Sequence, residues 1–113
     1  MSPAIRAGGF LFLTGATGGR PDGMMPETAG EQTEVALGKV AEILSHAGAD
    51  ESDVVELTSY HVDIETTFPQ VEAVLHGIFS APLPAWTAVG VAELRRPGAL
   101  VEFRIIAQDP TPE

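Results

Sequence analysis

A single carboxylate lies in the most apolar part of the chain. Residues 84–91 and 99–107 are two apolar segments typical of strands, separated by a turn that contains Pro97-Gly98. Glu102 is the only acidic residue of the second segment. Because burying a bare charge is costly, this carboxylate must be paired, hydrogen-bonded or in use on a ligand. The alternative is an edge-strand glutamate that points at water or pairs with Arg104, two residues along the same strand face.

Trp86, the only tryptophan of the chain, lies in the first of these apolar segments. An indole has a large apolar face and one N–H donor, so it suits stacking against a flat or aromatic ligand. The same ring could instead plug a former pocket at an interface. Both interpretations stay open from the residues alone.

The remaining chemistry-bearing side chains predict no metal centre. His61 lies on an expected strand and could titrate near neutral pH, but a lone histidine there is more often a packing residue. His46 and His76 lie on expected helices without the spacing of metal ligands. The chain has no cysteine, which rules out disulfides, thiolate ligands and cysteine nucleophiles.

Length and composition indicate one modest domain. The chain has 113 residues, of which 44% are hydrophobic and 19% charged. Its formal net charge of −10 would repel phosphate backbones and anionic membrane surfaces. We therefore expect a cytoplasmic domain over residues 1–109 with a flexible tail at 110–113, and no nucleic-acid or membrane partner.

The hydrophobic pattern predicts the element order β-β-α-β-α-β-β. Residues 15–26, rich in glycine, are expected to form a loop. Thr28, with Glu31 three residues later, is the expected capping box of a first helix that Gly48 ends. Thr66 or Thr67 is expected to cap a second helix, with Pro69 in its first turn. The expected strands are 4–7, 10–14, 53–64, 84–91 and 99–107.

This order predicts an α+β fold with two helices on one face of a mixed sheet. The other face then needs cover, which a small chain obtains most simply by oligomerisation. The two alternating sets of residues on strand 53–64 are both of mixed polarity, which favours burial between subunits. These sets are Glu56, Thr58, Tyr60 and Val62, and Leu57, Ser59 and His61.

Short segments spread over nearly the whole chain match one known pattern in order and spacing. They are Ser2 to Gly8, Thr14-Gly15, Glu31-Gln32-Thr33, Ala47-Gly48-Ala49, Asp53-Val54-Val55, Phe68 with Val71, Pro84-Ala85-x-Thr87, Gly98 to Glu102 and Ile106-Ala107. Each is weak alone, and together they are specific. With these segments the chain resembles the RidA/YjgF (Rid) family, whose older members are called endoribonuclease L-PSP.

The resemblance implies a chorismate-mutase-like fold and a homotrimer with ligand clefts between subunits. Typical members hydrolyse reactive imines or enamines to ketoacids and ammonia, without a metal or organic cofactor. An imine needs a positioned water, a group that handles its proton and an anchor for the substrate carboxylate. By the resemblance, Glu102 is the catalytic residue that acts on the water. The residues expected to bind the small-molecule substrate are Thr14, Gly15, Phe68, Glu72, Trp86, Thr87, Ala88 and Arg104.

The chain departs from the family at the carboxylate anchor. Members carry an arginine between Pro-Ala and Ser/Thr, and this chain has Trp86 there. Losing a charge-assisted pair weakens carboxylate binding by roughly 1.5–3 kcal/mol. Glu72 stands where members often have asparagine, and Arg104 where they have a second glutamate. Arg104 could pair with Glu102 or supply the missing cation from another wall.

Three functions follow from these residues. The first is a divergent hydrolase of imine- or enamine-type molecules, with Trp86 packed on the substrate in place of the arginine. The alternative is a non-catalytic small-molecule-binding or regulatory trimer that keeps the cleft without the chemistry. A ribonuclease rests only on the older family name, and the net charge of −10 argues against it.

Overall fold

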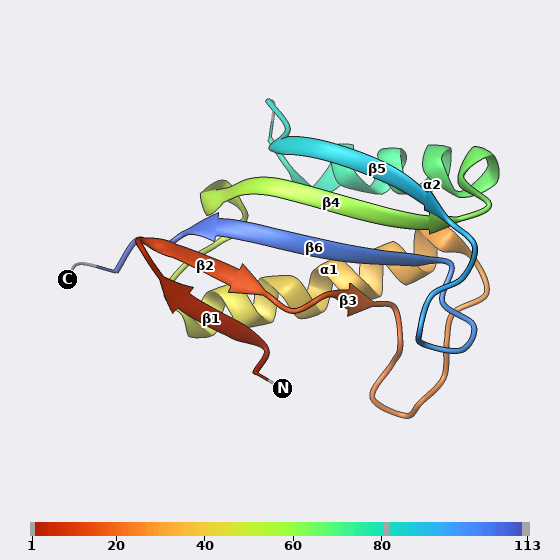
Figure 1. Cartoon of the computed structure of the whole chain (residues 1–113), viewed down its shortest axis with the longest axis horizontal. Helices are drawn as coiled ribbons and strands as arrows, with labels where there is room; N and C mark the ends of the chain where they lie inside the picture. Colours follow the sequence, from red (N-terminus) through yellow and green to blue (C-terminus); the bar gives the residue numbers. More distant parts are fainter. Residues whose placement is uncertain (1, 81, 112–113) are drawn as a thin grey trace.

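The protein is a six-stranded mixed sheet with both long helices on one face (Figure 1). The computed structural model describes residues 2–80 and 82–111. The sheet order is β1-β2-β6-β4-β5, and β3 pairs with β6 beside β2. The elements are β1 (Ala4–Ala7), β2 (Phe10–Leu13), β3 (Ala16–Thr17), α1 (Ala29–His46), β4 (Val54–Val62), α2 (Ile64–Ile78), β5 (Ala85–Val91) and β6 (Val101–Gln108).

This arrangement confirms the predicted α+β class. Figure 1 looks onto the sheet face that the helices leave uncovered, with α1 and α2 behind the strands. Only β4 and β5 run parallel, because α2 returns the chain to the starting edge before β5 begins. Among the described residues, no helix is both long enough and apolar enough to cross a membrane.

The two ends of α1 lie where their capping residues predict. The Thr28 hydroxyl oxygen accepts the main-chain N–H of Glu31 at 3.1 Å, and the hydroxyl donates to the Glu31 carboxylate at 3.1 Å. Gly48 follows the last turn with a φ of +81°, a left-handed conformation that glycine adopts without strain. The residues at both ends therefore fix the length of α1.

The predicted start of α2 is wrong. The helix begins at Ile64, after Asp63 in a left-handed conformation, and Pro69 lies inside it rather than in its first turn. Thr67 does not cap the helix because its hydroxyl is turned inward, where it donates to the Val62 and Asp63 carbonyls at 3.2 Å each. The Thr67 hydroxyl instead takes part in a buried hydrogen-bond network with His61 of β4.

The strands also differ from the prediction, most clearly in the expected loop 15–26 and in the strand expected over 53–64, which runs only from Val54 to Val62. The expected loop 15–26 contains β3, whose two residues pair with Phe103 and Glu102 of β6. So short a strand has no alternation that a sequence pattern could reveal. The strand expected from Asp53 begins at Val54, because a short 3₁₀ turn over Glu51–Asp53 comes first.

The alternation along β4 separates the two faces of the sheet. Leu57, Ser59 and His61 are fully buried beneath the helices, while Thr58 and Tyr60 lie half-buried on the uncovered face. The same alternation in β6 buries Phe103 and leaves Glu102 on the uncovered face. The sequence alone did not show which of the two alternating sets of β4 residues faces the helices. The structure shows that it is the set Leu57, Ser59 and His61.

Gln32, on α1, holds together the two loops at the end of the sheet. Its amide nitrogen donates to the carbonyls of Pro26 (2.8 Å) and Gly98 (3.1 Å), and its amide oxygen accepts the Leu100 N–H (2.8 Å). The side chain is 1% exposed. Gly18 packs directly on it, since a Cβ there would lie 2.5 Å from the Gln32 Cα. This contact fixes the path of the chain after β3.

The described part of the expected tail makes specific contacts. Thr111 donates its main-chain N–H to the Asp109 carboxylate at 3.0 Å, and its hydroxyl lies 3.5 Å from the Arg6 guanidinium. Arg6 also pairs with Asp109 at 2.7 Å. Residues 112 and 113 of the expected tail lie outside the described residues.

Candidate functional site

Glu102 lies on the uncovered face of the sheet, with β3 on one side and β4 on the other. Its neighbours across the strands are Thr17 and Tyr60. The side chain is half-buried, and it forms no hydrogen bond or ion pair within residues 2–80 and 82–111. The carboxylate is therefore free to act on a water molecule or a ligand.

Gly15 provides the space that the Glu102 carboxylate occupies. A Cβ at Gly15 would lie 2.5 Å from Glu102 Oε2 and 3.0 Å from its Cδ. Any side chain there would push the carboxylate aside. The structure thus brings these two predicted site residues into direct contact.

Thr14, the third predicted residue at this place, is occupied with local structure. Its hydroxyl donates to the Ser2 carbonyl at 2.6 Å, and its N–H donates to the Pro3 carbonyl at 2.9 Å. These bonds hold the segment before β1 against the end of β2. Thr14 therefore positions the strand end, while Gly15 contacts the candidate catalytic group.

Arg104 shares the face of Glu102 but is directed to another carboxylate. Its Nη1 lies 3.9 Å from Glu56 Oε1, with both side chains about half exposed (48% and 50%). An exposed pair at this distance contributes little to stability. Thr87 lies on the same face, because Thr58 of β4 is opposite both Thr87 and Arg104. Of the two interpretations of Arg104, a direct pair with Glu102 is not formed.

Trp86 lies on the opposite face of the sheet, under α2. Its ring stacks on Phe68 of that helix with centroids 5.0 Å apart and planes 6° from parallel. Its Nε1–H donates to Ser59 Oγ at 2.8 Å. Ala88 follows two residues later on the same side of β5. The indole is therefore clamped between a helix ring and a buried hydroxyl.

A line of four hydrogen-bonding side chains runs inward from the indole. Ser59 Oγ lies 2.7 Å from His61 Nε2, and His61 Nδ1 lies 3.1 Å from Thr67 Oγ1. The last three are at most 3% exposed. We refer to Trp86, Ser59, His61 and Thr67 as the indole relay. No buried side-chain nitrogen or oxygen of the described residues lacks a partner, so the relay is fully satisfied.

Only one direction of hydrogen-bond donation along the indole relay uses every donor proton of its four side chains. The indole N–H can only donate, so Ser59 accepts it and directs its own proton to His61 Nε2. His61 then carries a proton on Nδ1 and donates it to Thr67, whose hydroxyl donates to the main chain. This arrangement requires a neutral imidazole. Burial favours the same state, because it lowers the pKa of His61 below its ordinary value of 6.5.

Sequence reasoning found only part of the relay. It placed His61 among the packing residues, which its complete burial confirms. It missed Ser59 and Thr67 as partners of Trp86. The available signal was the alternation of Ser59 and His61 on the inward face of a strand, where buried polar groups need partners. Thr67, six residues beyond His61, could not be assigned because the start of α2 was misplaced.

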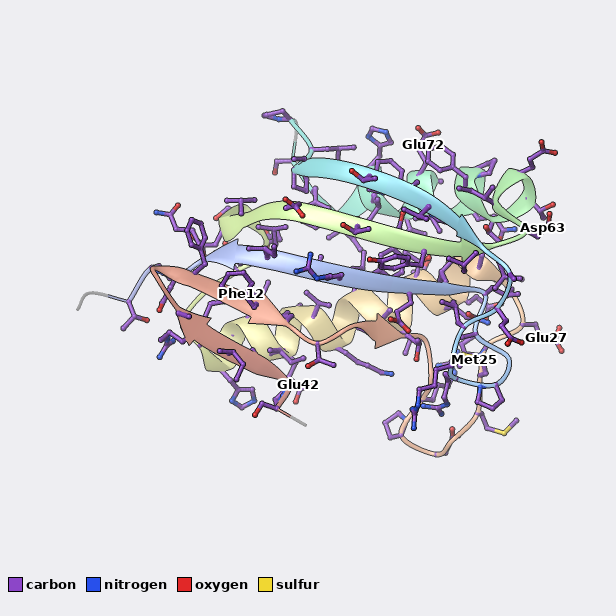
Figure 2. All side chains as sticks on the ribbon, in the orientation of Figure 1. Phe12, Met25, Glu27, Glu42, Asp63 and Glu72 are labelled. Carbon is purple, nitrogen blue, oxygen red and sulfur yellow. The ribbon has the colours of Figure 1, made fainter. Side chains whose placement is uncertain are left out.

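One chain therefore separates the predicted site residues into two groups. The uncovered side of the sheet carries Glu102, Gly15, Thr87 and Arg104. The helix side carries Trp86 and Ala88, with Phe68 of α2 packed against Trp86. Figure 2 shows Glu72 projecting from α2 beyond the β5 edge of the sheet. Within one chain, Glu102 and Trp86 therefore lie on opposite faces of the sheet.

A groove of about 670 Å³ lies between α1 and α2, and its walls include Leu37, Ala41, Ala73 and Ile78. None of the nine predicted site residues lines it.

Comparison with known proteins shows which family the chain is similar to. The family model described as endoribonuclease L-PSP matches residues 1–109. The RutC family protein YjgH of Escherichia coli is 39% identical over 110 residues, which cover 96% of this chain and 82% of that protein. The mouse 2-iminobutanoate/2-iminopropanoate deaminase is 32% identical over 108 residues, which cover 94% of this chain and 78% of the mouse protein.

A solved structure agrees with the fold. The structure titled Protein YJGH superposes with a TM-score of 0.89 at 37% identity, covering 98% of this chain and 85% of that one. The mixed sheet with two helices on one face is the chorismate-mutase-like α+β fold that the resemblance implied. On the match over residues 1–109 and these relatives, the chain belongs to the endoribonuclease L-PSP family, the family of RidA and YjgF.

Proposed function

We propose that this protein is a hydrolase of small imines or enamines in which Glu102 handles the attacking water. The observation that supports this most is the free, half-buried carboxylate against Gly15 on the uncovered sheet face. Several relatives carry the name 2-iminobutanoate/2-iminopropanoate deaminase, which is the same class of reaction. Substrate recognition differs, because Trp86 replaces the arginine that anchors a carboxylate in the family.

The chemistry needs one group that both takes and gives a proton. Glu102 accepts a proton from a water molecule while the water oxygen bonds to the carbon of the C=N group. The same proton then goes to the nitrogen, which gives a carbinolamine. Glu102 next moves the proton of the carbinolamine hydroxyl to the nitrogen, and the C–N bond breaks as the C=O bond forms, so that one imine and one water give one carbonyl compound and one ammonia. No other reactant is required.

The active unit in this proposal is a homotrimer with clefts between subunits. The uncovered face carries exposed apolar side chains, including Ile5, Phe10 and Phe12, at 55%, 41% and 38% exposure. Such a face favours contact with another protein surface. Since one chain keeps Glu102 and Trp86 on opposite faces, a cleft that uses both requires the β5 edge of a neighbouring chain.

Ammonia release from freshly generated imines tests the proposal. The wild-type protein is expected to accelerate the release, and Glu102→Gln should abolish the acceleration while keeping the fold, because an amide cannot accept the proton. Trp86→Arg is the companion variant, and it should gain hydrolysis of 2-iminoacids. No acceleration over background by the wild-type protein would exclude the hydrolase.

The alternative of a non-catalytic small-molecule-binding or regulatory trimer has one observation in its favour. Trp86 is fixed by Phe68 and Ser59, as a residue that plugs a former pocket would be. This alternative predicts that ligands raise the melting temperature without product formation. The sole tryptophan makes binding measurable by its own fluorescence.

A further inference from the structure

The polar end of Trp86 is already engaged inside the protein. Its Nε1–H donates to the fully buried Ser59, and Ser59 in turn lies 2.7 Å from His61 Nε2. Ser59 cannot turn away without breaking both bonds. The indole therefore has no polar hydrogen left for a ligand, and the ring surface that remains accessible is carbon.

Within one chain, the elements around Trp86 offer a ligand carboxylate no cation, since neither α2 nor β5 contains a lysine or arginine. Arg104, on the uncovered face, is already directed to the Glu56 carboxylate at 3.9 Å. Phe68 covers one face of the indole, and Glu72, one helical turn after Phe68, adds a negative charge at the β5 edge (Figure 2). A carboxylate here would meet carbon and a like charge. A flat cation would meet aromatic rings and a carboxylate, both of which attract it.

We propose that the substrate is the imine of a simple amine rather than of an amino acid, so that it carries no carboxylate and is cationic when protonated. This inference rests on the function proposed above, since it describes the ligand of the same cleft. The reaction is R–CH=NH plus H₂O giving R–CHO plus NH₃, with the proton passing through Glu102. Trp86 with Phe68 selects the substrate, and the remainder of the indole relay positions the ring.

Two flat probes of one shape test the ligand class without any turnover. Benzamidine carries a cationic group and benzoate an anionic one on the same ring. Calorimetric titration of the wild-type protein should show benzamidine binding at least about tenfold more tightly than benzoate. Equal affinities, tighter binding of benzoate, or no binding of either probe overturns the inference.

Matched variants separate the local effect from the net charge of the protein. Trp86→Arg should reverse the preference, while Met24→Arg adds the same charge at a loop position that is 64% exposed and should leave the preference unchanged. If Trp86→Arg does not fold, Glu72→Gln gives the second test. It removes the negative charge one helical turn after Phe68 at an exposed position and should weaken benzamidine binding about two- to tenfold relative to benzoate. An unchanged ratio of the two affinities in Glu72→Gln contradicts the inference.

The two proposals can fail independently. Ammonia release that depends on Glu102, combined with equal affinity for the two probes, would overturn the substrate class and keep the hydrolase. A tenfold preference for benzamidine without ammonia release would overturn the hydrolase and keep the ligand class of the site.

Discussion

At the scale of single residues, the indole relay makes the interior sensitive to protonation. His61 accepts from Ser59 on Nε2 and donates to Thr67 from Nδ1, so it has no free nitrogen for a second proton. A charged imidazole would break the bond from Ser59 and leave a charge buried at 0% exposure. The neutral histidine is therefore part of the folded structure rather than a group available to solvent.

The first prediction is a loss of stability on acidification. Since burial lowers the pKa of His61 from its ordinary 6.5, the unfolded chain binds a proton before the folded protein does. The contribution is complete above pH 6.5 and decreases as the pH falls toward the lowered pKa, by at most about 1.4 kcal/mol per pH unit. Urea denaturation between about pH 7 and pH 5 measures it.

Two histidine variants assign that pH dependence. His76→Gln changes an exposed histidine of α2 and should retain the dependence, whereas His61→Gln should reduce it because the titrating group is gone. A wild-type free energy of unfolding that does not decrease between pH 6.5 and pH 5 would contradict the assignment of a neutral buried His61.

The second residue-scale prediction concerns Gly15. Gly15→Ala places a methyl group where Glu102 Oε2 now lies, at a built distance of 2.5 Å. The Glu102 side chain can move, so the fold should survive with little change in melting temperature. Ammonia release should fall about 100-fold, since a displacement near 1 Å is that costly to a positioned proton acceptor. Steady-state kinetics measures the change.

Gly38→Ala is the matched control for this substitution. Gly38 is in α1, and a Cβ there would meet nothing within 4 Å. The variant should gain about 1 kcal/mol of stability from helix propensity and keep the wild-type rate. Full activity in Gly15→Ala would show that the position of the Glu102 carboxylate does not matter to the reaction.

At the scale of elements, local patterns predicted what local interactions decide. Thr28, Glu31 and Gly48 set the ends of α1 through contacts within a few residues, and the prediction there is confirmed. The start of α2 was missed because the Thr67 hydroxyl bonds a histidine on β4, a contact that no pattern around Thr67 reveals. Elements whose ends depend on tertiary contacts cannot be read from their own sequence.

The prediction at the scale of elements concerns the buried side chain of Gln32. Its three hydrogen bonds join α1 to the two loops that close one end of the sheet, and it is 1% exposed. Gln32→Leu should lower the free energy of unfolding by about 2–4 kcal/mol, because three main-chain groups lose their partner. Chemical denaturation measures the difference.

Gln70→Leu is the control for this helix substitution. Gln70, on α2, is half-buried and accepts one short hydrogen bond, from the Gly30 N–H at 3.1 Å. Its replacement should cost about 1 kcal/mol, clearly less than the Gln32 change. Equal losses in the two variants would show that Gln32 does not hold the loops together.

At the scale of the whole molecule, the candidate site could be predicted only in pieces. The resemblance identified Glu102 and Gly15, and the structure places them in contact because Gly15 leaves room for the carboxylate. Trp86 was expected in the same cleft, yet within one chain it faces the helices with Phe68. Which face of a sheet a β5 residue occupies depends on how β5 pairs with β4, and sequence alternation gives the period without the side.

Assembly is the property of the whole molecule on which the proposed cleft depends, and Phe12 tests it. This ring is 38% exposed on the uncovered sheet face and lies 6.4 Å from the ring of Phe10 (Figure 2). Phe12→Glu places a charge in that apolar surface, so burying the surface against another chain becomes unfavourable. Light scattering during size-exclusion chromatography should show a trimer for the wild-type protein and smaller species for the variant.

Met24→Glu makes a comparable apolar-to-acidic change on a loop at 64% exposure and should remain trimeric. A monomeric wild-type protein at micromolar concentration would remove the shared cleft, and Glu102 and Trp86 could then no longer act on one ligand.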